Sequence, residues 1–266
     1  MASPPALLEA RGIRKSFGRV EALRGADFEV HEGEVVALMG DNGAGKSTLI
    51  KTLAGVLTPD AGEIWFDGER ITLSSAQDAR RRGIETVYQD LALADTLDPP
   101  ANLFLGREMV RKGLWGRIGF LDHAAMRAQA SEAFERLGVT VRAEHGAVGS
   151  LSGGQRQGVA VCRAVMWASR VIFMDEPTAA LGIAQTHNVL GLIERVRASG
   201  VAVVLISHSV PEVLAVADRI EVMRLGRRVA RLRAADATTE AVVAAITGAE
   251  TEDLPDRQNT VDGGQR

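Results

Sequence analysis

The chain has 266 residues, of which 46% are hydrophobic, 24% charged and 4% aromatic, and its formal net charge is -3. This composition is typical of a globular protein, and the length suffices to bury a core without disulfide bonds or a structural metal. The single cysteine, Cys162, excludes a disulfide framework. The nearly neutral charge argues against a broad nucleic-acid-binding surface, so no nucleic-acid partner is expected.

Apolar segments in this sequence are short. The longest aliphatic runs, such as residues 201–206, fall far below the roughly 20 residues that a membrane-spanning helix requires. Residues 1–5 do not show the basic and then apolar pattern of a signal peptide. We therefore expect a chain that remains in the cytoplasm.

The N-terminal part of the chain predicts an antiparallel sheet. Short strand patterns occur between Leu7 and Val36, around residues 64–66 and at Ile71. Turn dipeptides separate them, namely Arg24-Gly25, Glu32-Gly33 and Asp67-Gly68. This spacing of strands and turns is typical of consecutive antiparallel strands.

Continuous apolar strands then alternate with amphipathic helices. The clearest strands cover residues 34–39, 171–174 and 201–206, and helices are expected over residues 47–54 and 184–199. Strands without an exposed face are typical of a parallel sheet that is covered by helices on both sides. The alternation therefore predicts a parallel α/β core.

The segment from about residue 91 to residue 168 lacks strand patterns and is predicted to be a helical insertion. Asp122 is the expected N-cap of a helix, and a second helix is expected over residues 155–167. The apolar side chains of the first helix recur at helical spacing: Met126, Ala130, Phe134 and Leu137.

The C-terminal part predicts a hairpin and one more helix. Leu225-Gly-Arg227 is a turn between short strands, and residues 239–246 follow a helical pattern. The polar residues 249–266 have almost nothing to bury and are expected to be a disordered tail. We expect a single domain over residues 6–248.

A phosphate-binding motif follows the first apolar strand. Residues 40–47 read Gly-Asp-Asn-Gly-Ala-Gly-Lys-Ser and match G-x-x-x-x-G-K-[ST] at the start of a helix. In this motif backbone N–H groups surround the phosphates, the lysine reaches the β and γ phosphates, and the serine hydroxyl ligates Mg²⁺. The predicted nucleotide-binding residues are Gly40, Asp41, Asn42, Gly43, Ala44, Gly45, Lys46, Ser47 and Thr48.

A pair of carboxylates ends the strand over residues 171–174. Asp175 is predicted to hold Mg²⁺, and Glu176 to orient or deprotonate the attacking water. Taken alone, such a pair is more often a helix N-cap. The phosphate-binding motif upstream favours the catalytic interpretation.

The segment Leu151-Ser-Gly-Gly-Gln155 is a second cradle of amide and hydroxyl groups at a helix start. With this segment the sequence resembles the ATP-binding subunits of ABC transporters. The resemblance implies an α/β fold with a P-loop NTPase core of the RecA type, an antiparallel β subdomain and an inserted α-helical subdomain. It also implies a dimer of two such subunits, in which one subunit caps the partner's ATP through Ser152, Gly153, Gly154 and Gln155.

The resemblance implies roles for further residues. Phe17 resembles the aromatic that stacks on adenine, although a core aromatic of the antiparallel sheet is an alternative. Gln89 resembles a glutamine that contacts Mg²⁺, and His208 a histidine that contacts the γ-phosphate, although a polar strand cap is the alternative for His208. The candidate catalytic residues are thus Glu176, His208 and Lys46. The sequence departs from the family at Gly182, where an aspartate is usual, and this puts one cross-dimer contact in doubt.

Residues 88–95, 101–107 and 176–181 look like those of monosaccharide importers of the ribose, xylose and fructose type. This resemblance implies a Mg²⁺-dependent ATPase that drives a separate membrane permease from the inner face of the cell membrane. An extracytoplasmic sugar-binding protein would be an indirect partner. The alternatives are an importer of another small solute, such as an amino acid, and a soluble ABC ATPase without a transport role.

Overall fold

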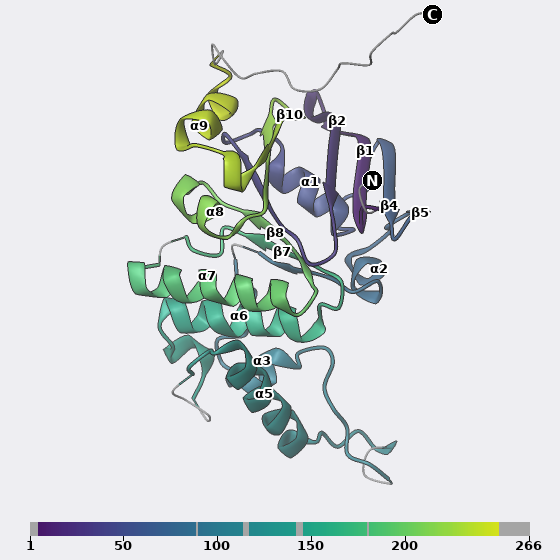
Figure 1. Cartoon of the computed structure of the whole chain (residues 1–266). Coiled ribbons are helices and arrows are strands. Elements are labelled where there is room, and N and C mark those ends of the chain that lie inside the picture. Colours follow the sequence, from purple (N-terminus) through teal and green to yellow (C-terminus); the bar gives the residue numbers. More distant parts are fainter. Residues whose placement is uncertain (1–4, 89, 114–116, 142–145, 180, 250–266) are drawn as a thin grey trace, which may run out of the picture.

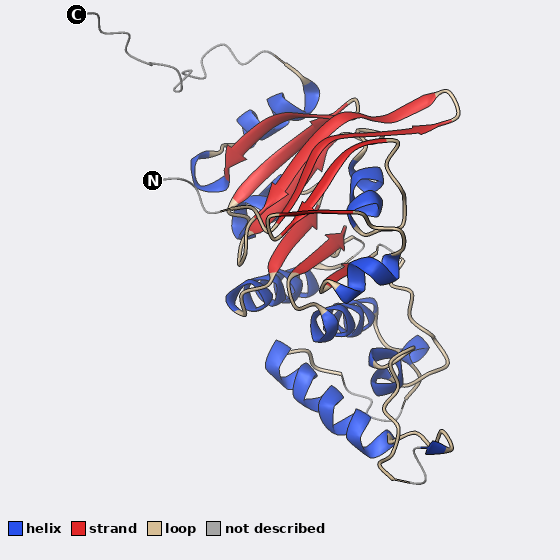
Figure 2. Cartoon of the chain, turned by 90° about the vertical axis from the view of Figure 1, so that its right-hand side faces the viewer, coloured by secondary structure: helices blue, strands red, loops and turns tan. Residues whose placement is uncertain are grey.

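The computed structural model describes residues 5–88, 90–113, 117–141, 146–179 and 181–249. Its strands form two sheets, one largely parallel and one antiparallel, and helices cover both faces of the parallel sheet (Figures 1 and 2). This is the mixed α/β architecture that the alternation of strand and helix patterns predicts.

The six-stranded sheet has the order β10-β9-β3-β8-β7-β6. Its strands pair in parallel except for β9 and β10, which form an antiparallel hairpin. The three predicted apolar strands are confirmed as β3, β8 and β7, the central part of the sheet. The bounds are β3 Val35–Gly40, β6 Ile84–Val87, β7 Val171–Asp175, β8 Ala202–Ile206, β9 Arg219–Arg224 and β10 Arg227–Arg233.

The predicted antiparallel sheet is also present. It has four strands in the order β2-β1-β4-β5, so β2 lies at one edge. The bounds are β1 Leu8–Phe17, β2 Val20–Val30, β4 Ala61–Phe66 and β5 Glu69–Ile71. The Asp67-Gly68 turn joins β4 to β5 as expected.

Alternate side chains of the central strands enter two different cores. Val36 and Leu38 of β3 belong to a core shared with α1 and the antiparallel sheet, and α1 therefore lies between the two sheets. Val35 and Ala37 face the opposite core, which they share with α6, α7 and α8. The helices beside the parallel strands are α1 Lys46–Leu53, α2 Ala76–Arg81, α7 Ile183–Ala198, α8 Val210–Val216 and α9 Thr239–Thr247.

In the segment predicted as a helical insertion, the described residues form helices joined by loops, with one isolated antiparallel bridge between Val110 and Leu121. Asp122 caps α5 as predicted, since its Oδ1 accepts the N–H of Ala125 at 3.1 Å. The second predicted helix, α6, begins at Gly153 and not at Gln155, because Ser152 is its N-cap. Figure 1 shows α3 and α5 on the side of α6 that faces away from the sheets. The bounds are α3 Pro99–Leu103, α5 His123–Leu137 and α6 Gly153–Trp167, with 3₁₀ turns at Val148–Ser150 and Ala234–Asp236.

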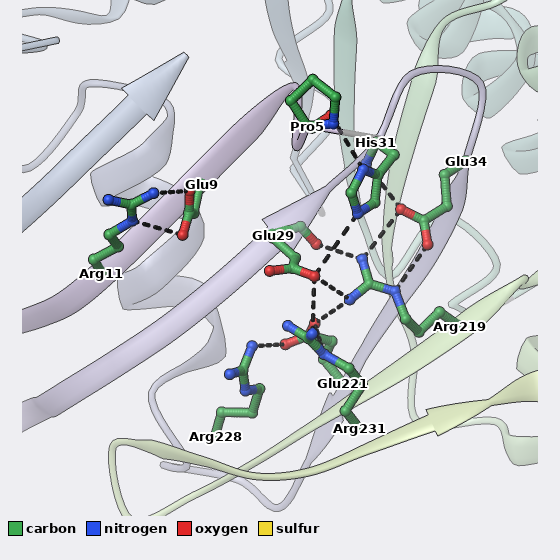
Figure 3. Close-up of polar contacts among 10 residues, drawn as sticks. All are labelled: Pro5, Glu9, Arg11, Glu29, His31, Glu34, Arg219, Glu221, Arg228 and Arg231. Carbon is green, nitrogen blue, oxygen red and sulfur yellow. Dashed lines mark hydrogen bonds and ion pairs between the residues drawn. The ribbon is translucent and has the colours of Figure 1, made fainter. Parts of the chain in front are cut away.

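A network of ion pairs joins the hairpin β9–β10 to strand β2 (Figure 3). The Glu221 side chain is only 1% exposed and contacts the guanidinium groups of Arg219, Arg228 and Arg231 at 2.7, 3.2 and 3.1 Å. Arg231 also contacts Glu29 of β2 at 2.8 Å. The two sheets are therefore connected by partly buried ion pairs as well as by the core around α1.

Within the part of the chain that the structure describes, no helix has both the length and the hydrophobicity needed to cross a bilayer.

Candidate nucleotide-binding site

The candidate site lies where three parallel strands end. Ile206 of β8 is in register with Asp175 of β7 and with Leu38 of β3. The segments that follow these strands therefore begin at the same edge of the sheet. Open α/β sheets bind their ligands at the carboxyl edge of the strands.

The phosphate loop, residues 40–47, encloses its lysine. Lys46 is only 6% exposed, and its Nζ donates to the carbonyl oxygens of Gly40 and Asp41 at 2.8 and 3.0 Å. Burial lowers the pKa of Lys46, against the opposing effect of Glu176, Asp41 and Asp175. The ammonium group is thus held inside the loop, where negative charge would stabilise it.

The backbone of the phosphate loop presents donors for an anion. Helix α1 begins at Lys46, so the N–H groups of Lys46, Ser47 and Thr48 have no partner within the helix. Gly45 precedes them in the left-handed region with φ +101°, which glycine adopts at little cost. A lysine, free helix-terminal amides and the exposed Ser47 hydroxyl form a donor set that fits the phosphates of a nucleotide.

Strand β2 and the turn of the β9–β10 hairpin pack directly against the phosphate loop. The Ala44 carbonyl accepts the N–H of Gly226 at 3.0 Å, and the Gly226 carbonyl accepts the N–H of Arg24 at 2.8 Å. A side-chain carbon at Gly45 would lie 2.7 Å from the carbonyl oxygen of Ala22. The loop is thus held between β2 and the turn of the β9–β10 hairpin.

Glu176 and His208 form a pair beside the phosphate loop. Glu176 Oε1 lies 2.8 Å from His208 Nε2, with 26% and 46% of the two side chains exposed. The Glu176 backbone has φ +49°, which is uncommon for a residue other than glycine. Its N–H donates to the carbonyl oxygen of Ile206 at 3.0 Å. Backbone strain of this kind is concentrated at functional sites.

Asp175 is the metal-ligating candidate on β7. Burial raises the pKa of its carboxyl, and neighbouring Glu176 adds to this effect. A cation bound at this carboxylate would favour its charged form and so lower the pKa of Asp175 again. Among the described residues, no three His, Cys, Asp or Glu side chains cluster to hold a metal. Asp175 and the Ser47 hydroxyl are oxygen ligands of the type that Mg²⁺ uses together with water and substrate phosphates.

The segment around Ser152 lies at the start of α6. The side chains of Ser152 and Gln155 cap the helix reciprocally, each accepting the other's backbone N–H, at 3.3 and 3.1 Å. Ser152 and Gly153 are exposed, whereas a side-chain carbon at Gly154 would lie 2.6 Å from Gln185 of α7. The contacts of this segment are thus with α7.

The remaining candidates have different outcomes. Phe17 is 49% exposed at the end of β1, so the alternative of a core aromatic is wrong. Gln89 lies outside the described residues. Cys162 is buried, which raises the pKa of its thiol to about 12 and gives it no nucleophilic role.

Sequence reasoning missed two contacts near Glu176. It named Glu176 and His208 separately, although both follow strands that prove to be neighbours. It gave no role to Glu212 of α8, whose Oε2 accepts the Thr178 hydroxyl at 2.6 Å. This hydrogen bond ties the segment after Glu176 to α8, and no local sequence motif signals it.

Comparisons with known proteins extend these observations. The model of the family described as ABC transporter matches residues 23–179. The fructose import ATP-binding protein FrcA of Rhizobium meliloti is 50% identical over 252 residues, which cover 94% of this chain and 96% of that protein. The xylose/arabinose import ATP-binding protein XylG of Sulfolobus acidocaldarius is 42% identical over 241 residues. The matched region covers 91% of this chain and 94% of that protein.

Longer proteins and a solved structure also match. The ribose import ATP-binding protein RbsA 1 of Rubrobacter xylanophilus is 42% identical over 97% of this chain, which spans only 50% of that protein. A nucleotide-free ATP-binding cassette from an ABC transporter superposes with a TM-score of 0.77 and 26% identity, covering 91% of this chain and 96% of that one.

Proposed function

The chain belongs to the ABC transporter family of ATP-binding proteins, and from this premise we propose that it powers the import of a monosaccharide through a separate membrane permease. The chain is an ATPase with a P-loop NTPase fold. The observation that favours a sugar is the 50% identity to a fructose import ATP-binding protein, over 96% of that protein.

In the proposed site, each side chain at the sheet edge has a separate role. Lys46 and the amides at the start of α1 bind the phosphates. Ser47, Asp175 and Gln89 would hold Mg²⁺, which when bound neutralises charge on the phosphate oxygens. Glu176 accepts a proton from the attacking water, and His208 fixes the orientation of its carboxylate through the 2.8 Å contact. Phe17, exposed at the end of β1, would stack on adenine.

The site is proposed to be completed by a second copy of the chain. Ser152 and Gly153 are exposed at the start of α6, so a nucleotide held by a partner could reach them. The two copies would meet head to tail, each capping the partner's ATP with residues 152–155. Gly182 caps α7 without a side-chain hydrogen bond, so the usual aspartate contact at this position would be absent.

Replacing Ser152 with arginine should abolish most hydrolysis while the monomer binds ATP with nearly unchanged affinity, because the bulky cation would block the partner's nucleotide and not its own. Titration of the monomer with a fluorescent ATP analogue and a steady-state ATPase assay measure the two properties. Ser75→Arg, which removes the serine N-cap of α2, controls for the loss of a helix cap of about 1 kcal/mol. Equal losses of affinity and hydrolysis in Ser152→Arg would contradict the role in the partner's site.

The transported solute is tested by uptake in cells whose own copy carries Glu176→Gln. Uptake of labelled fructose, ribose or xylose should fall to background, whereas uptake of a labelled amino acid should not change. Loss of amino-acid uptake alone would favour an importer of another solute. Unchanged uptake of all of them, with the chain in the ribosomal fraction and not at the membrane, would favour a soluble ABC ATPase.

A further inference from the structure

We propose that Gly226, in the turn of the β9–β10 hairpin, is a positioning residue for the phosphate loop and that the affinity for ATP depends on it. The inference rests on the proposed binding of ATP by residues 40–48. Gly226 itself does not belong to the motif and lies about 180 residues further along the chain.

Gly226 connects two segments through its backbone. Its N–H donates to the Ala44 carbonyl of the phosphate loop at 3.0 Å, and its carbonyl accepts the N–H of Arg24 in β2 at 2.8 Å. Strand β2 is an edge strand of the antiparallel sheet, so it has backbone groups free to bond outside that sheet. The backbone of this one residue therefore links the phosphate loop both to the hairpin and to β2.

The same hairpin supports the beginning of the phosphate loop. A side-chain carbon at Gly40 would collide with the carbonyl oxygen of Met223. Gly40 and Met223 are in register between β3 and β9. The loop thus touches the hairpin near both of its ends, at Gly40 through Met223 and at Ala44 through Gly226.

The contacts around Gly226 leave no space for a side chain. A Cβ atom there would lie 2.8 Å from the Ala22 carbonyl oxygen and 3.1 Å from the Arg24 nitrogen. Both are backbone atoms, so no side-chain rotation relieves the contact. Either β2 or the hairpin must shift, and each of them contacts the loop at Ala44 or Gly45, directly before Lys46.

The β4–β5 turn offers a matched control. Asp67 and Gly68 have φ +54° and +78°, and Leu225 and Gly226 have φ +50° and +77°, so the two hairpin turns share nearly the same conformation. A Cβ atom at Gly68 would meet nothing within 4 Å. Alanine at position 68 therefore carries the backbone strain of a positive φ without the collision.

The experiment compares Gly226→Ala with Gly68→Ala. The dissociation constant of Mg-AMP-PNP, a non-hydrolysable ATP analogue, should rise about tenfold or more in Gly226→Ala only, which corresponds to roughly 1.4 kcal/mol of binding energy. The thermal midpoint should fall in both variants, because both acquire a strained residue. Equal dissociation constants in the two variants would overturn the positioning role. Failure of the wild-type chain to bind the nucleotide would instead overturn the proposed function on which the inference rests.

A second measurement uses the wild-type chain and is decisive if Gly226→Ala does not fold. Hydrogen exchange of the segment 222–230 should slow when Mg-AMP-PNP binds, because the Gly226 N–H is bonded to the loop that the nucleotide orders. Exchange of the segment 64–72, which contains the control turn, should not change. Unchanged exchange in 222–230 while exchange in the phosphate loop slows would overturn the inference.

Discussion

Replacing Glu176 with glutamine should slow ATP hydrolysis by about 10²- to 10⁴-fold, the usual contribution of a general base. The amide keeps the shape of the side chain and can still accept the hydrogen bond from His208 Nε2 at 2.8 Å. It cannot accept a proton from water. Lys46, Ser47 and Asp175 are unchanged, so ATP should still bind, and a dimer that bridges two nucleotides should persist because the ligand is not consumed.

A steady-state ATPase assay and size-exclusion chromatography with Mg-ATP check this expectation. Glu194→Gln, at an exposed position on α7, is the control for removing one carboxylate. Hydrolysis at the wild-type rate in Glu176→Gln would remove Glu176 from the catalytic role. An inactive but strictly monomeric variant would leave that role intact and contradict the proposed dimer, and Gly182 would then be the first position to investigate.

Replacing Lys46 with alanine should reduce hydrolysis by at least about 10²-fold, because a charged donor aimed at the reacting phosphate is lost. The structure adds a second reason. The Lys46 ammonium also links the carbonyls of Gly40 and Asp41 across the loop, so its removal leaves those groups without their donor and loosens the loop before any nucleotide arrives.

The assay for Lys46→Ala is turnover at saturating ATP, with Lys112→Ala, an exposed lysine outside the site, as control. A Lys46→Ala variant that turns over at a near-normal rate would contradict the assignment of the phosphate loop. Because saturating ATP compensates for weaker binding, a remaining loss reports on the chemical step.

The sequence predicted those features that depend on short segments. The phosphate loop, the apolar strands β3, β7 and β8 and the Asp122 cap are each encoded within fewer than ten consecutive residues. Strand β6 was not predicted, since it has four residues and includes the charged Glu85. That side chain is buried because it pairs with Arg107 at 2.6 Å, a contact that local hydropathy does not reveal.

The contacts between distant segments could not be predicted in this way. The pairing of Glu176 with His208 depends on β7 and β8 being neighbours, and the bond from Gly226 to Ala44 depends on how the β9–β10 turn reaches across to β2. The sequence did predict a turn at residues 225–227. It gave no sign of what that turn would touch, because tertiary contacts are not part of a local pattern.

The ion pairs of Glu221 constrain how this sequence can change over time. Loss of that one carboxylate would remove the partner that Arg228 contacts at 3.2 Å, whereas Arg219 would keep its contact to Glu34 and Arg231 its contact to Glu29. Removing one partner of a buried ion pair typically costs about 3–5 kcal/mol, whereas exchanging the whole group for apolar residues is often neutral. Replacing Glu221 alone should therefore lower the free energy of unfolding, whereas replacing the charged residues together by apolar ones should lower it less, so we expect these positions to change together.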